Sequence, residues 1–141
     1  MKIAIYPGSF DPFHQGHLNV VRKASLLFDR LYIVVSRNIN KTTSFKLDSR
    51  VRLITEVTKD IKNVEVIRND DKLTTDIAKL VDAKYIIRGL RNKNDFDYEL
   101  AYYDGFKSLD PNIEVIYFIS SSQTRALSSS TIKEIEFFKK D

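Results

Sequence analysis

Short apolar runs alternate five times with segments of helical periodicity, and this alternation limits the possible folds more than any other feature. The runs predict short strands, and Leu31–Val35 is nearly all apolar, as expected of a strand covered on both faces. These strands are Ile3–Tyr6, Leu31–Val35, Val64–Ile67, Tyr85–Ile87 and Ile113–Ile119. Strands that alternate with helices pair in parallel through right-handed crossovers. The sequence therefore predicts an α/β fold with a doubly wound, five-stranded parallel sheet.

Apolar residues spaced by three or four positions predict one helix after each strand. The helices are marked by Leu18 to Phe28, Leu47 to Ile61, Leu73 to Val81, Phe96 to Phe106, and Ile132 to Phe138. The 141 residues contain no internal repeat, low-complexity segment or linker. We therefore expect residues 1–141 to form a single domain.

Composition excludes several classes of protein. The chain has no cysteine, which excludes disulfides and thiol chemistry, and no apolar run approaches the roughly 20 residues of a membrane span. The net charge of +4 is modest, and a few cations around one anionic ligand would account for it without nucleic acid. We expect a cytoplasmic protein that binds neither membrane nor nucleic acid.

The loop after the first strand carries groups suited to phosphate. Pro7–Gly16 connects that strand to the first helix, and His14 and His17 stand where the helix begins. Free N–H groups and the helix dipole attract anions at such a position. Two other interpretations remain open: a zinc pair, which would need carboxylates as further ligands, and a capping and packing role. Ser9 follows Gly8 and is either a phosphate contact or a turn residue.

Three further loops, which follow the second, fourth and fifth predicted strands, begin at the same edge of the sheet. Doubly wound folds bind ligands at this edge. Lys41 follows the second strand, and Arg88 and Arg91 follow the fourth. The planar arginine fork suits phosphate or carboxylate, although surface arginine is the alternative. Glu99 follows on the next helix and would bind a ribose hydroxyl or an amine, or pair with a neighbouring cation.

Ser128-Ser129-Ser130-Thr131 directly precedes the last helix. A capping box between Thr131 and Glu134 would explain one hydroxyl. Four hydroxyl residues in a row, after the fifth strand, instead predict a second helix start that binds phosphate.

These groups exceed what one monophosphate needs, and a triphosphate together with a second phosphorylated substrate would use them. No carboxylate is placed as an obvious base. A phosphate nucleophile needs none, because it is ionised at neutral pH. Attack of a phosphate on the α-phosphorus of a nucleotide, catalysed by positioning and charge stabilisation, therefore fits better than hydrolysis.

Gly8-Ser9-Phe10-Asp11-Pro12 with His14-Gln15-Gly16-His17 resembles the (T/S)FDPxHxGH signature of the nucleotidyltransferase superfamily. Three further segments resemble the bacterial phosphopantetheine adenylyltransferase family within it: Ile87 to Arg91, Asp95 to Glu99, and Ser128 to Ser130 before Lys133-Glu134. The match spans essentially the whole chain. The resemblance implies a Rossmann-like domain that transfers AMP from ATP to 4'-phosphopantetheine, giving dephospho-coenzyme A and pyrophosphate in coenzyme A biosynthesis. It also implies a requirement for Mg²⁺, without assigned protein ligands, and a homohexamer.

The resemblance further implies a role for each matching residue. His17 and Lys41 would be catalytic. The phosphopantetheine would be held by Ser9, Lys41, Thr74 and Arg88. The ATP would be held by Ser9, Phe10, His17, Gly89, Leu90, Arg91, Glu99, Thr124, Arg125, Ala126, Leu127, Ser128, Ser129 and Ser130.

The chain departs from the family pattern at three of these positions. The family often has Thr at Ser9, usually has an aromatic residue at Thr124, and has Ile at Leu127. Two alternatives remain beside this interpretation. One is another branch of the superfamily, a cytidylyltransferase or a nicotinate or nicotinamide mononucleotide adenylyltransferase. The other is a catalytically silent nucleotide sensor.

Overall fold

The computed structural model describes residues 1–37, 46–120 and 128–139, and strands alternate with helices throughout. The strands are β1 (Ile3–Gly8), β2 (Arg30–Ser36), β3 (Val64–Asn69), β4 (Tyr85–Leu90) and β5 (Glu114–Ile119). The helices are α1 (Gln15–Ser25), α2 (Leu47–Thr58), α3 (Thr74–Leu80), α4 (Lys93–Leu109) and α5 (Ser129–Lys139). The predicted α/β class and the predicted order of elements are thus confirmed.

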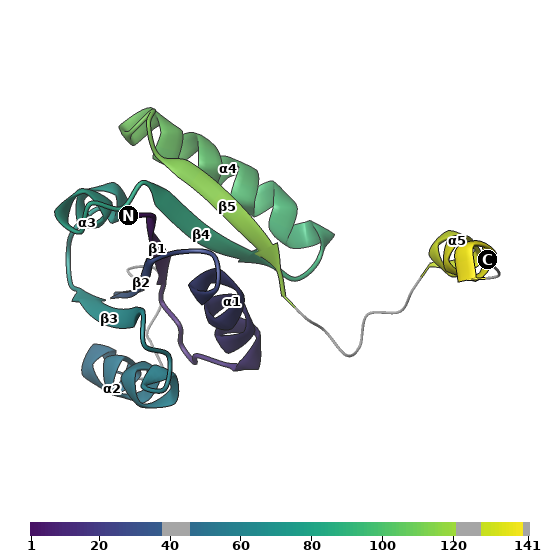
Figure 1. Cartoon of the computed structure of the whole chain (residues 1–141). Helices are drawn as coiled ribbons and strands as arrows, with labels where there is room; N and C mark the ends of the chain where they lie inside the picture. Colours follow the sequence, from purple (N-terminus) through teal and green to yellow (C-terminus); the bar gives the residue numbers. More distant parts are fainter. Residues whose placement is uncertain (38–45, 121–127, 140–141) are drawn as a thin grey trace.

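β1 lies in the middle of the sheet, whose strand order is β3-β2-β1-β4-β5 (Figure 1). All four strand pairs are parallel. Ala4 of β1 aligns with Leu31 of β2 on one side and with Tyr85 of β4 on the other. The chain first builds outward from β1 to β3 and then crosses back to β4. The order therefore switches direction between β1 and β4, where doubly wound sheets bind ligands.

Two apolar layers cover the sheet. On one face, Val21 of α1 and Ile54 of α2 pack with Ala4 and Ile33. On the other, Ile77 of α3 and Phe106 of α4 join a cluster that includes the strand residue Ile86. Because side chains alternate between the two faces of a strand, neighbouring residues of each strand enter different layers. Burial on both faces explains why the central strands β1 and β2 are almost continuously apolar.

Two of the predicted boundaries are wrong next to the site. β1 does not stop at Tyr6, since Pro7 and Gly8 still align with Val34 and Val35 of β2. β4 likewise extends past Ile87 to Leu90 because β5 pairs with it over its whole length. In both strands pairing with a neighbour outweighs the local preference for a turn at Pro and Gly. Because both strands are longer than predicted, the site residues at and after their carboxyl ends lie further along the strand direction.

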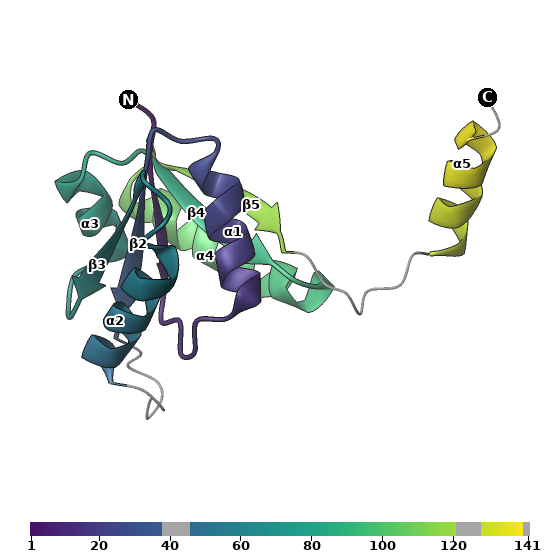
Figure 2. The same cartoon turned by 60° about the horizontal axis from the view of Figure 1, so that its bottom comes forward.

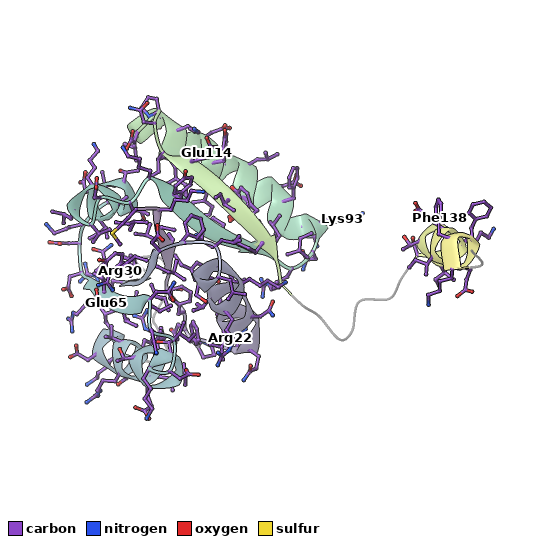
Figure 3. All side chains as sticks on the ribbon, in the orientation of Figure 1. Arg22, Arg30, Glu65, Lys93, Glu114 and Phe138 are labelled. Atoms are coloured by element: carbon purple, nitrogen blue, oxygen red, sulfur yellow. The ribbon has the colours of Figure 1, made fainter. Side chains whose placement is uncertain are left out.

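α5 stands apart from the sheet and its other helices (Figure 2). None of its residues is buried. Ile132, Ile135 and Phe138, whose spacing predicts this helix, are exposed rather than packed, as Figure 3 shows for Phe138. Ser128, not Thr131, caps it: the Thr131 N–H donates to Ser128 Oγ at 3.2 Å. Within the described ranges, no helix is long and apolar enough to cross a membrane.

Candidate active site

A cavity of about 780 Å³ opens at the carboxyl ends of β1 and β4, at the switch in strand order. The β1–α1 loop forms one wall and contributes Ser9, Phe10 and His17. The end of β4 and the start of α4 form the other and contribute Arg88 and Glu99. Residues separated by some eighty positions thus share one cavity, as the sequence predicts for its first and fourth loops.

His14 and His17 make a reciprocal cap at the start of α1. The Gly16 N–H donates to His14 Nδ1 at 3.0 Å, and the His14 N–H donates to His17 Nδ1 at 3.1 Å. The two rings stack with centroids 3.8 Å apart. A Cβ at Gly16 would lie 2.9 Å from His14 Cε1, so a larger residue would displace the His14 ring from this position. The capping interpretation is therefore correct for both histidines.

The cap also decides the protonation of His17. Since Nδ1 accepts a hydrogen bond, we assign the proton of the neutral ring to Nε2. Burial is the largest cause, and together with the neighbouring charges of His14 and Arg91 it lowers the pKa of His17 to about 4. At neutral pH the ring is thus an uncharged hydrogen-bond donor. It can donate from Nε2 to a phosphoryl oxygen while its other nitrogen holds the backbone.

Phe10 fixes the floor of the loop. Its side chain is 4% exposed, and its ring meets the edge of Tyr6 at 5.1 Å and of His17 at 5.0 Å between centroids. Gly8 allows this approach, because a Cβ there would lie 3.0 Å from Phe10 Cζ. Burial raises the pKa of Tyr6, so its hydroxyl stays protonated. Phe10 is predicted to contact ATP, but in the structure its side chain belongs mainly to the hydrophobic core.

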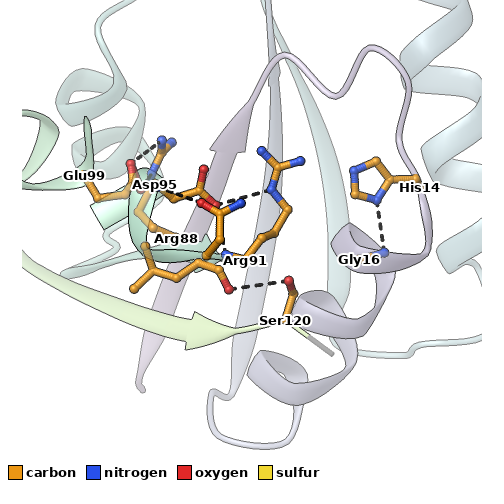
Figure 4. A network of polar contacts seen from close by, with 9 residues as sticks. His14, Gly16, Arg88, Arg91, Asp95, Glu99 and Ser120 are labelled. Atoms are coloured by element: carbon orange, nitrogen blue, oxygen red, sulfur yellow. Dashed lines mark hydrogen bonds and ion pairs between the residues drawn. The ribbon is translucent and has the colours of Figure 1, made fainter. Parts of the chain in front are cut away.

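Arg88 and Glu99 form a part-buried, two-pronged ion pair in which Glu99 is the buried partner (Figure 4). Arg88 Nε donates to Glu99 Oε1 at 2.6 Å, and Nη2 donates to Oε2 at 2.9 Å. The guanidinium also lies 4.8 Å from the ring centroid of Tyr102. Burial acts to lower the pKa of Arg88, but the hydrogen bonds and charge of Glu99 raise it overall. Of the roles considered for Glu99, the structure shows pairing with a cation.

Arg91 lies between the Arg88–Glu99 pair and His14 in Figure 4. Its backbone N–H donates to Asp95 Oδ2 at 2.9 Å, so the first turn of α4 holds the end of β4. The guanidinium is largely exposed, and its Nε lies 3.4 Å from the same carboxylate. This places a cation at the mouth of the cavity, where it can turn toward an anionic ligand.

The cavity brings together seven of the predicted site residues. Those that line it are Ser9, Phe10, His17, Arg88, Gly89, Arg91 and Glu99. Thr74 begins α3 and Leu90 lines a smaller apolar cavity beside α4, so neither lines the main one. Ser128, Ser129 and Ser130 stay with α5, away from the cavity. Lys41 and Thr124 to Leu127 lie outside the described residues.

Sequence reasoning missed Arg50, which is 2% exposed and donates to backbone carbonyls behind the cavity. A signal for it exists in the sequence. Arg50 lies three residues after Leu47 and four before Ile54, on the apolar face of α2. A cation on the buried face of a helix needs buried partners, and loop carbonyls supply them.

Comparisons with known proteins identify the family of the chain. Residues 5–135 match the cytidylyltransferase-like family. The chain is 63% identical to a phosphopantetheine adenylyltransferase of Mycoplasma capricolum subsp. capricolum, over 99% of this chain and 100% of the relative. It is 45% identical to one of Clostridium botulinum, over 98% of this chain and 86% of the relative.

Two solved structures share the fold. A lipopolysaccharide core biosynthesis protein from Thermoplasma volcanium has a TM-score of 0.63 at 22% identity, covering 86% of this chain and 99% of that one. Pantoate-beta-alanine ligase from Francisella tularensis has a TM-score of 0.63 at 13% identity, covering 99% of this chain and 70% of that one. The close sequence relatives, together with the matched family, establish membership: the chain belongs to the cytidylyltransferase-like nucleotidyltransferases and, within them, to the phosphopantetheine adenylyltransferase family.

Proposed function

We propose that the protein transfers AMP from ATP to 4'-phosphopantetheine. A phosphate oxygen of phosphopantetheine forms a bond to the α-phosphorus of ATP, the bond to the bridging oxygen breaks in line with it, and pyrophosphate leaves. The products are dephospho-coenzyme A and pyrophosphate, so the reaction serves coenzyme A biosynthesis. The observation that carries the proposal is one cavity in which His17, Arg88 and Arg91 meet.

These groups suit a transition state in which negative charge builds on the phosphoryl oxygens. The Nε2–H of neutral His17 donates to an α-phosphate oxygen without first losing or gaining a proton. Arg88 faces the phosphate of phosphopantetheine while Glu99 keeps its fork in place. Preorganised donors of this kind stabilise developing charge because they need little reorientation during the reaction.

Other proposed contacts depend on family resemblance. Lys41 would add an ammonium to the reacting phosphates, and Thr74 would help to hold phosphopantetheine. Gly89 to Arg91 and Thr124 to Ser130 would hold the nucleotide. We assign Glu99 to this site through Arg88, since its carboxylate oxygens bind that guanidinium.

The cavity is chemically compatible with Mg²⁺. Within the described ranges, no three metal-ligating side chains form a cluster. Mg²⁺ at nucleotide sites relies mainly on phosphate oxygens and water, with one or two carboxylates. Asp11 and Asp95 are the aspartates that line the cavity, so they would hold a Mg²⁺ that arrives with ATP. When bound, the ion would neutralise charge on the phosphate oxygens.

The outer face of α4 is suited to a second copy of the chain, and we propose the homohexamer that the family resemblance implies. Phe96 and Leu100 are about half exposed and border an apolar cavity of about 390 Å³ with Tyr103 and Tyr117. Exposed apolar patches of this kind mark interaction sites. Light scattering on the purified protein tests the assembly.

We also propose the cytoplasm as the site of action, where ATP is available.

Pyrophosphate release from ATP, with and without phosphopantetheine, tests the reaction. We expect release that depends on both substrates, with a stoichiometric yield of dephospho-coenzyme A. Replacing ATP by CTP, and phosphopantetheine by nicotinate or nicotinamide mononucleotide, tests the other branches of the superfamily. Faster turnover with any of these replacements would overturn the substrate assignment, and nucleotide binding without turnover would indicate a sensor.

A further inference from the structure

Arg50 joins the ends of two neighbouring strands from behind the cavity. It projects from the buried face of α2 and is 2% exposed. Its Nη1 donates to the carbonyl of Ser9, directly after β1, and to the carbonyl of Ser36 at 3.0 Å, at the end of β2. One guanidinium nitrogen therefore holds two chain segments whose following loops both carry predicted phosphate contacts.

The carbonyl of Ser9 belongs to the peptide that precedes an unusual backbone. Phe10 has φ 50, in the left-handed region that residues with a Cβ rarely adopt. The orientation of the Ser9–Phe10 peptide is coupled to that angle, because rotation about it turns the Ser9 carbonyl relative to the Phe10 side chain. A donor fixed on the Ser9 carbonyl therefore favours the backbone that turns Phe10 inward.

The inward Phe10 ring in turn supports His17. The two rings meet edge to face at 5.0 Å, with an interplanar angle of 90°. Phe13 covers the other part of His17, with ring centroids 5.4 Å apart. If Phe10 turned outward, the imidazole would lose a packing partner and gain contact with water. Arg50 thus reaches His17 through a single intermediate side chain.

The same support extends to β3. Asn69, 6% exposed at the end of that strand, donates to Ser36 Oγ at 3.2 Å and to the carbonyl of Lys72 at 2.9 Å. The Lys72 N–H returns a bond to Asn69 Oδ1 at 2.9 Å. Ser36 is therefore held from both sides, by Arg50 and by Asn69, and the point to which Arg50 fastens Ser9 is itself fixed.

We propose that Arg50 is a positioning residue for the transfer reaction: it holds the Ser9–Phe10 peptide so that Phe10 keeps His17 oriented toward the phosphates. The rate effect rests on the proposed function, whereas the effect on the His17 ring does not. A planar guanidinium can donate to two carbonyls from one side of its fork, while a lysine ammonium is a point donor on a flexible stem. The proposal therefore distinguishes arginine from lysine at this position.

The test uses the full-length protein with Arg50→Met and Arg50→Lys, and Arg52→Met as a matched control. Arg52 is an exposed arginine on the same helix. For each variant, kcat is measured per folded molecule, below its melting midpoint, together with the KM for ATP. The ¹⁵N signals of the imidazoles report the tautomer, and the chain has only two histidines to resolve.

We expect Arg50→Met to lower kcat on the order of 100-fold, the scale on which a displaced catalytic group acts. Its His17 signals should shift from the Nε2–H tautomer toward the mixture of a solvated ring. Arg50→Lys should fall between Arg50→Met and the wild type, and Arg52→Met should match the wild type in both readouts.

Three results would overturn the proposal. The first is an Arg50→Met protein with wild-type His17 signals and a kcat within twofold of Arg52→Met. The second is full recovery in Arg50→Lys. The third is failure of both Arg50 variants to fold, which would make the residue a requirement of the whole fold. A wild type without transferase activity would instead refute the proposed function, and the imidazole signals would still test the role of Arg50.

Discussion

Two helices of this chain begin where a predicted phosphate loop ends, and their first turns are held in different ways. The start of α1 is fixed by two imidazoles that accept backbone N–H groups and by rings packed against them. The start of α5 is held by serine and threonine hydroxyls that bond mainly to one another, with Ser128 Oγ 2.7 Å from Thr131 Oγ1. No residue of α5 is buried, whereas Val20, Val21 and Ala24 of α1 are.

The difference separates two kinds of phosphate site. The first turn of α1, the proposed site, is already held in place by its cap and by the core. The start of α5 lies away from the cavity and would have to move to reach a ligand there. If ATP binding fixed α5 in place, the entropy lost by the helix would reduce the observed free energy of ATP binding. Substitutions at the two sites should therefore differ in whether they change the rate, the affinity or the stability.

The largest effect is expected from His17→Ala. It removes a preorganised donor at the reacting phosphate, so kcat should fall by about 100- to 1000-fold. Far-UV circular dichroism should remain unchanged, because Phe10 and the apolar face of α1 still pack. Steady-state pyrophosphate release measures the change. A fall of less than tenfold would show that the α1 start is not the reacting site.

A comparably large effect, on stability rather than on rate, is expected from Glu99→Gln. The variant leaves Arg88 without its buried carboxylate, and breaking such a pair costs about 3–5 kcal/mol in the free energy of unfolding. Urea denaturation measures it. The control is Glu56→Gln, whose ion pair with Lys59 is exposed and should contribute only about 0–1 kcal/mol. Equal losses in both variants would contradict the structural role of the Arg88–Glu99 pair.

Ser129→Ala should change the affinity for ATP but not the stability, whereas Glu99→Gln should change the stability. If the α5 start joins the cavity when ATP binds, losing one hydroxyl to a charged phosphate should raise the KM for ATP by about tenfold. The melting midpoint should stay at the wild-type value, since Ser129 is exposed and α5 has no buried residues. An unchanged KM would leave the α1 and β4 loops as the ATP phosphate contacts.

The smallest expected change is in the titration of His17. Its pKa of about 4 lies below that of an ordinary histidine, so its imidazole signals should stay constant between pH 8 and pH 5. Between pH 6.5 and 4 the unfolded state binds more protons at this residue than the native state. Its contribution to the free energy of unfolding should therefore decrease as the pH falls through that range. A midpoint near 6.5 in the native protein would refute a buried, neutral ring.

The sequence predicts which segments are buried in the sheet better than it predicts the residue at which each strand ends. Leu31–Val35 is nearly all apolar because β2 is covered on both faces. Pro7 and Gly8 are read locally as a turn, yet their alignment with Val34 and Val35 keeps them in β1. Periodicity records burial, whereas the end of a strand depends on a neighbour that is distant in sequence.

The candidate site is predictable in its groups and less so in their partners. His17 and Arg88 are predicted at one edge of the sheet because each follows a predicted strand, and the structure brings them to one cavity. That Glu99 pairs with Arg88 depends on how α4 packs over β4, which no spacing reveals. Arg50 reaches the Ser9 carbonyl from α2, a helix that is distant in sequence. The apolar spacing of α5 predicts a helix but does not show where that helix lies relative to the sheet.

The central position of β1 has a consequence for synthesis of the protein. Its first residues leave the ribosome earliest, but Ala4 and Ile5 align with Tyr85 and Ile86 on one side. Closing a contact over such a distance in sequence is slow and requires most of the chain. The nascent polypeptide therefore carries His17 long before Arg88 exists beside it, and the cavity cannot form before β4 and α4 have been synthesised.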